Sequence, residues 1–114
     1  MKVAIIGPIC SDEVIVKKKR CFQLGGLTYY AGNALAALGV ETTIFGSFGR
    51  KGKWLEGLRC ADLVHVKAEG TIKFINEYPE ENPDIRLQRA EIHKNTITIA
   101  DLRKYGLKKF DYVI

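Results

Sequence analysis

Residues 25–39 constrain the fold more than any other part of the chain. The pair Gly25 and Gly26 leads into an alanine-rich segment that ends at Gly39. Two adjacent glycines let the backbone approach a ligand closely and reach positive φ without a steric penalty. Thr28 is a candidate N-cap, and Gly39 suits the C′ position just after a helix. The pattern predicts a slim helix over about residues 28–38 that packs tightly against a sheet.

Apolar runs on both sides of this segment predict the strands of a parallel sheet. Residues 3–6 are continuously apolar, which is typical of a central strand buried on both faces. Residues 42–45 are β-branched and aromatic, as in strands. A strand, a helix and a second strand in this order form a βαβ unit. Residues 14–16 and 21–24, joined by a basic run, predict a hairpin with one exposed face.

The second half of the chain predicts shorter elements. Strands are expected at 63–67, 71–78 and 85–87, with a proline-containing loop between the last two at 79–84. A short strand is also expected at 96–99, and a core strand at 110–114. Short helices are expected at 53–60 and 101–108.

Three of these segments together resemble the N-terminal part of the ribokinase-like (PfkB-type) carbohydrate kinases. Residues 25–39 fit the family's motif of a glycine pair, an alanine-rich helix and Leu-Gly. Residues 1–12 resemble its first strand, glycine turn and substrate-contacting Asp, and residues 43–49 resemble its second core strand and Gly-x-x-Gly turn. The resemblance implies an α/β, Rossmann-like ribokinase fold that is incomplete, because residues 1–114 correspond to its N-terminal half. The length of 114 residues predicts a single domain, and the resemblance adds a small β-lid, built from strands at about 14–24 and 71–87.

The resemblance assigns four residues to a substrate-binding site. Asp12 matches the family's early Asp, which accepts hydrogen bonds from substrate hydroxyls, and a carboxylate is well suited to this. Gly25 and Gly26 match the pair that packs against the substrate. Tyr30 stands where many members have Asn, and we expect it to form part of the pocket wall. From the residues alone, Asp12 could instead cap a turn after Ser11, and the glycine pair could form a plain tight turn.

The same resemblance implies transfer of a phosphoryl group from ATP, with Mg²⁺, to a hydroxyl of a sugar or nucleoside. In the family, the anion hole and catalytic Asp belong to a Gly-Ala-Gly-Asp-type turn, which this sequence lacks. No Walker-type loop is present either. We therefore predict a substrate-binding portion with no catalytic residue, no ATP or Mg²⁺ site and no metal site, inactive by itself. The alternative is a non-catalytic α/β module that binds a polyol or forms dimers.

The charge and the exposed surface of the chain indicate which partners it could bind. The net charge of +5 could suit nucleic acid, but the one basic run, Lys17 to Arg20, has no interleaved aromatic residues and no nucleic-acid-binding motif around it. We expect a solvated turn there and no nucleic-acid partner. An exposed lid sheet is costly unless it is covered, and lids in several family members pair between subunits. A homodimer through the lid is therefore expected.

The cysteines and the apolar runs indicate the cellular compartment of the protein. Cys10, Cys21 and Cys60 show no CxxC spacing, which argues against a disulfide framework or a zinc site. Free thiols suit a reducing compartment. No apolar run approaches the ~20 residues of a membrane span, and the N-terminus lacks the pattern of a signal peptide. The sequence therefore predicts a cytoplasmic protein with no membrane partner.

Overall fold

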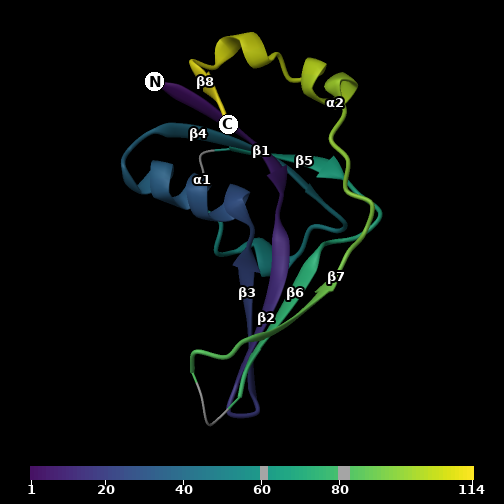
Figure 1. Ribbon diagram of the computed structural model, residues 1–114. Coiled ribbons are helices and arrows are strands. Elements are labelled where there is room, and N and C mark those ends of the chain that lie inside the picture. Colours follow the sequence, from purple (N-terminus) through teal and green to yellow (C-terminus); the bar gives the residue numbers. More distant parts are fainter. Residues whose placement is uncertain (60–61, 80–82) are drawn as a thin grey trace.

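Two four-stranded sheets make up most of the described part of the molecule, which is elongated, with a longest extent of 51 Å (Figure 1). The computed structural model describes residues 1–59, 62–79 and 83–114. Strand β1 (Lys2–Pro8) belongs to the first sheet, and β2 (Cys10–Val16) belongs to the second. Only Ile9 separates these two strands, and its side chain is fully buried. The two sheets are therefore joined by nearly continuous extended chain.

The first sheet is parallel and has the order β5-β4-β1-β8. Its strands besides β1 are β4 (Glu41–Phe48), β5 (Asp62–Lys67) and the short β8 (Tyr112–Val113). These confirm the strands predicted at 3–6, 42–45 and 63–67, and the strand predicted at 110–114 forms over two residues. The sheet's core is made of buried apolar residues of β1 and β4 and of Ile9: Val3, Ile5, Ile9, Ile44, Phe45 and Phe48.

Helix α1 (Leu27–Ala37) covers one face of the first sheet (Figure 1). Gly32 contacts Ile44 so closely that a Cβ at this position would overlap the Ile44 side chain. Gly39, at φ +77°, follows the end of the helix, as the sequence predicts. The N-cap prediction is wrong: Gly26 occupies that position, and Thr28 is buried against Gly7 with no capping hydrogen bond. Burial of the threonine against the strand replaces its capping role.

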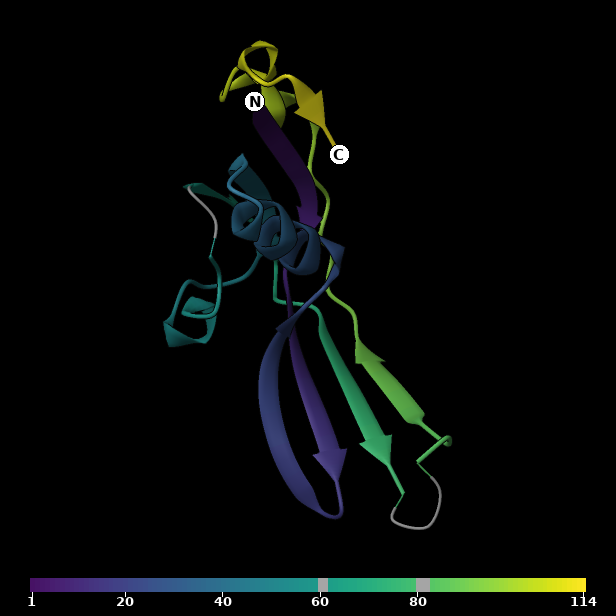
Figure 2. The ribbon, with the colours of Figure 1, turned by 90° about the vertical axis from the view of Figure 1, so that its left-hand side faces the viewer.

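The second sheet, called the lid sheet below, has the order β3-β2-β6-β7. It consists of β2, β3 (Lys19–Gly25), β6 (Lys73–Tyr78) and β7 (Leu87–Glu91). β2 and β3 form the predicted hairpin, which turns at Lys17 and Lys18, and β2 pairs in parallel with β6. Figure 2 shows the strands of the lid sheet projecting away from α1. The strand predicted at 85–87 forms later in the chain, as β7.

Three predicted elements differ from the structure. The helix expected at 53–60 is a single 3-10 turn, η1 (Lys53–Leu55), and Cys60 lies outside the described residues. The strand expected at 96–99 is wrong, because Thr98 is the N-cap of α2 (Ile99–Arg103) and forms a capping box with Asp101. The helix expected at 101–108 ends early, since Gly106 at φ +64° separates α2 from η2 (Leu107–Lys109). The loop expected at 79–84 lies partly outside the described residues.

The C-terminal segment contacts the first sheet on the side away from α1. Phe45 packs edge-on against Tyr105 and Phe110, with ring centroids 5.5 and 5.8 Å apart. Ile44, its neighbour in β4, faces α1 instead, as alternation along a strand requires. In the described part of the chain, no helix is long and apolar enough to cross a membrane.

Candidate substrate-binding site

A cavity of about 520 Å³ lies on one face of the lid sheet. All four lid strands or their adjoining loops contribute to its wall, together with the first turns of α1. Its lining side chains are mainly polar and aromatic: Asp12, Val14, Gln23, Tyr30, Phe74, Asn76, Tyr78, Arg86 and Gln88. Aromatic and apolar surface with a few polar groups is the usual composition of a small-molecule site.

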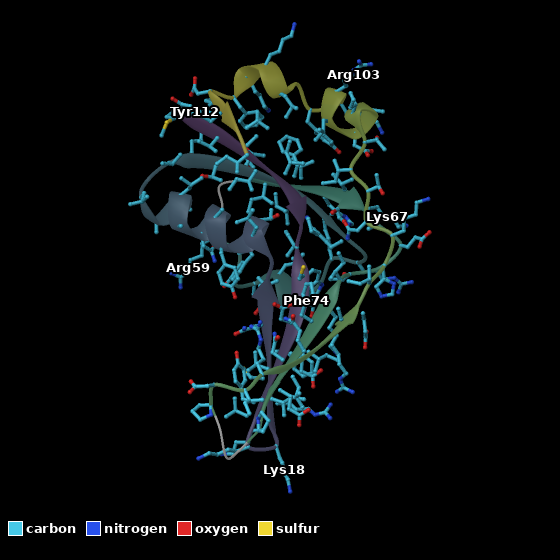
Figure 3. The ribbon with its side chains drawn as sticks, in the orientation of Figure 1. Lys18, Arg59, Lys67, Phe74, Arg103 and Tyr112 are labelled. Carbon is cyan, nitrogen blue, oxygen red and sulfur yellow. The ribbon has the colours of Figure 1, made fainter. Side chains whose placement is uncertain are left out.

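Asp12 lies at the end of this cavity nearest the first sheet. It is opposite Gln23 in the hairpin, is 8% exposed, and accepts a long hydrogen bond of 3.4 Å from the Phe74 backbone N–H. Burial raises the pKa of Asp12, and the hydrogen bond from Phe74 partly opposes this effect. Figure 3 labels Phe74 near the base of the lid sheet and Lys18 at its far tip. Asp12 is therefore a partly desolvated hydrogen-bond acceptor at the base of the lid.

The neighbouring carboxyl group faces the other way. Because side chains alternate across a strand, Glu13 lies on the opposite face of the lid sheet. There its two carboxylate oxygens lie 3.0 Å from Lys73 Nζ and 3.1 Å from an Arg20 guanidinium nitrogen. The hydrogen bond from Lys73, aided by the charges of Lys73 and Arg20, lowers the pKa of Glu13 against the effect of burial. Of this adjacent acidic pair, only Asp12 is available to a ligand in the cavity.

The two glycines have different positions. Gly25 packs against the Asp12 carboxyl group, and a Cβ there would overlap it. Gly26, at φ +92°, turns the chain from β3 into α1. A Cβ on Gly26 would lie 3.0 Å from the Pro8 carbonyl oxygen and 3.3 Å from Cys10 Sγ. Gly25 thus positions the acidic side chain, whereas Gly26 lies beside Cys10 and does not line the cavity.

Tyr30 lines the cavity and is 55% exposed. Its ring meets that of Tyr29 edge-on, with centroids 5.1 Å apart. Tyr29 lines a different hollow, of about 620 Å³, on the side of α1 that faces residues 56–59. Asn33 belongs to this second hollow, where its side chain accepts a 2.9 Å hydrogen bond from the Arg59 backbone N–H. Asn33 therefore does not share a cavity with Asp12.

Sequence reasoning missed five of the polar or ionisable residues in the cavity wall. These are Gln23, Asn76, Tyr78, Arg86 and Gln88. Asn76 and Gln88 are paired across β6 and β7 by a 2.8 Å hydrogen bond. The alternation of the strand at 71–78 could have placed Asn76 and Tyr78 on one face. No local pattern indicates that Gln88 and Arg86 join them, because this depends on how β7 pairs with β6.

Cys10 is buried beside this site without lining it. Burial, with a further contribution from the negative charge of Asp12, raises the pKa of the Cys10 thiol to about 11. The thiol is therefore protonated at neutral pH, and a nucleophilic role would need the thiolate. Within the described ranges, no three side chains of His, Cys, Asp or Glu converge as a metal ion would require.

The chain is similar to known proteins in structure. No protein-family model matches the chain, and no curated protein gives a significant match. Among solved structures, a sulfate complex of a pyrophosphate-dependent kinase in the ribokinase family is 24% identical, with a TM-score of 0.71. The match covers 89% of this chain and 37% of that one. The chain carries part of the ribokinase fold.

Two further ribokinase-fold structures agree. An uncharacterized sugar kinase from Pyrococcus horikoshii is 15% identical with a TM-score of 0.74, over 99% of this chain and 42% of that one. Arabidopsis thaliana ribokinase, complexed with ribose and ATP, is 15% identical with a TM-score of 0.69, over 89% of this chain and 41% of that one. The chain thus spans about two fifths of these ribokinase-fold structures. The resemblance seen in the sequence, and the partial α/β fold it implies, are confirmed at the level of the fold.

Proposed function

We propose that residues 1–114 form the substrate-binding portion of a kinase that phosphorylates a hydroxyl of a sugar or nucleoside. The supporting observation is the buried Asp12 carboxyl group, held against Gly25 at the base of a cavity in a ribokinase-like fold. Carboxylate oxygens accept hydrogen bonds from hydroxyl groups, which polyols carry in number. Amide groups of Gln23, Asn76 and Gln88 add donors and acceptors along the same wall.

We assign no residue of this sequence to binding the phosphoryl donor or to catalysing the transfer. The family resemblance implies ATP with Mg²⁺, an anion hole and a catalytic Asp from a glycine-containing turn that this sequence lacks. Phosphoryl transfer depends on such groups to stabilise the migrating charge. We therefore propose that residues 1–114 bind the acceptor without transferring phosphate by themselves. In the cytoplasm, where we expect the protein, sugars and nucleosides are both available.

Sugar binding by wild type and by Asp12→Asn tests this proposal. Calorimetric titration of the 114-residue chain would use ribose, fructose, myo-inositol and adenosine. A hydrogen bond to a charged group contributes about 1.5–3 kcal/mol, so we expect Asp12→Asn to weaken binding roughly 10- to 100-fold. Asp62→Asn, an exposed carboxylate on β5 of the first sheet, is the matched control. Equal affinities for wild type and Asp12→Asn would refute the role of Asp12.

A second candidate function, a dimerisation module, has two observations in its favour. Phe22 and Leu87 lie on the lid-sheet face opposite the cavity and are 66% and 57% exposed. Both outer strands of this sheet, β3 and β7, also have an unpaired edge within the described chain. Exposed apolar side chains on a sheet with open edges favour association with another chain. We propose a second copy of this chain as that partner.

A further inference from the structure

One cation lines the substrate cavity. Of the described side chains in its wall, Arg86 carries the only formal positive charge and Asp12 the only carboxyl group. The other side chains of the wall are amide, phenol and apolar groups. A cavity for an unmodified sugar needs hydrogen-bonding groups and apolar surface but no full positive charge. The Arg86 guanidinium should therefore influence which polyol the cavity binds.

Arg86 and Asp12 lie at opposite ends of the cavity. Asp12 is level with Phe74, because Glu13 pairs with Ile75 in the β2–β6 register. Arg86 is level with Tyr78, because Leu87 pairs with Glu77 in the β6–β7 register. Four residues of β6 span roughly 13 Å. Asp12 is thus at the base of the lid, and Arg86 is toward its tip.

Arg86 makes no ion pair with another described residue, whereas the cations nearest to Glu13 on the opposite face are paired. Lys73 and Arg20 pair with Glu13 on the opposite face. None of the ion pairs formed within residues 1–59, 62–79 and 83–114 includes Arg86, and its side chain is exposed. The guanidinium is therefore available to an anion that enters the cavity. A guanidinium presents planar, paired donors that match phosphate and carboxylate oxygens.

We infer that the substrate is an anionic polyol, whose phosphate or carboxylate binds Arg86 while its hydroxyls at the other end bind Asp12. This inference rests on the proposed function and specifies the substrate class. It makes Arg86 a specificity-determining residue: it selects charged over neutral polyols and lies far from the hydroxyl that Asp12 holds.

Matched pairs of charged and neutral sugars test the inference. The full 114-residue chain is titrated with fructose, fructose 6-phosphate, ribose, ribose 5-phosphate and gluconate at one fixed ionic strength. Wild type should bind at least one anionic polyol about tenfold more tightly than its neutral counterpart. Arg86→Gln should abolish that difference, while Arg86→Lys retains part of it. Comparison of the sugar phosphates with gluconate shows which anion is preferred.

Arg89→Gln is the matched control. Arg89 lies in β7 next to Gln88 and therefore on the opposite face of the lid sheet, so its charge should not contribute to the cavity. The inference would be overturned if Arg86→Gln and Arg89→Gln lost the preference for anionic polyols equally. It would also be overturned if wild type bound anionic and neutral polyols with the same affinity. If neutral sugars still bind in an Asp12-dependent manner, only the anionic substrate class fails. If no polyol binds, the proposed function fails with it.

Discussion

At the scale of single residues, the contact between Gly25 and Asp12 defines the candidate site. A Cβ at position 25 would overlap the Asp12 carboxyl group. We expect Gly25→Ala to lower the free energy of unfolding by about 1–3 kcal/mol, as overpacking does, and to displace Asp12 from the cavity. Denaturant titration of Gly25→Ala, Asp12→Ala and the double variant measures the coupling.

Truncation of Asp12 supplies the control for that prediction. In an Asp12→Ala background the overlapping carboxyl group is gone, so Gly25→Ala should cost less there, with a coupling energy of about 0.5–3 kcal/mol. Strictly additive effects would mean that Gly25 is required for another reason.

At the scale of elements, the β2–β3 hairpin carries a strained turn. Lys17 and Lys18 both have positive φ, 49° and 62°, in a two-residue connection that suits Asn-Gly. Left-handed backbone costs a non-glycine residue roughly 1–2 kcal/mol. We expect Lys17→Asn/Lys18→Gly to raise the free energy of unfolding by about 1–2 kcal/mol, measured by chemical denaturation.

The hairpin also has a matched charge control. Lys17→Gln/Lys18→Gln removes the same two charges but keeps side chains that are strained at positive φ. It should leave the free energy of unfolding nearly unchanged. A gain as large as that of the Asn-Gly variant would mean that repulsion within the basic run, not the backbone, destabilises the turn.

At the scale of the whole molecule, the exposed face of the lid sheet predicts self-association. Phe22 is 66% exposed there, and Lys73 Nζ lies 5.6 Å from its ring centroid. Sedimentation at high micromolar concentration should show a dimer, and Phe22→Asp should shift it toward monomer, since burying an unpaired charge is costly. Leu38→Asp, at a site 79% exposed just beyond the end of α1 and away from the lid sheet, is the control. Wild type that sediments only as a monomer would remove the dimer.

Local patterns predicted the elements whose residues carry their own signal. The helix after Gly26, the buried β1 and the hairpin all follow from residue spacing and from turn chemistry. The errors have two causes, a tertiary contact at Thr28 and an overlooked local capping pattern at Thr98. Thr28 could cap a helix but is buried against Gly7, and Thr98, assigned to a strand by its β-branched neighbours, caps α2 through Asp101. The burial of Thr28 depends on Gly7, which is distant in sequence and outside any local window, whereas the Thr98 cap is a local Thr-x-x-Asp pattern that could have been read from the sequence.

The sequence by itself determined the βαβ unit, the hairpin and the resemblance that assigned Asp12, Gly25, Gly26 and Tyr30 to a site. Those features can be inferred from residue periodicity, glycine placement and motif spacing. Only the tertiary structure decided that Asp12 and Glu13 face opposite sides of one sheet, and that Arg86 shares a cavity with Asp12. Strand alternation and the pairing of β2, β6 and β7 bring residues together that are distant in sequence. The chemistry of the cavity therefore follows from sheet register, which no single segment encodes.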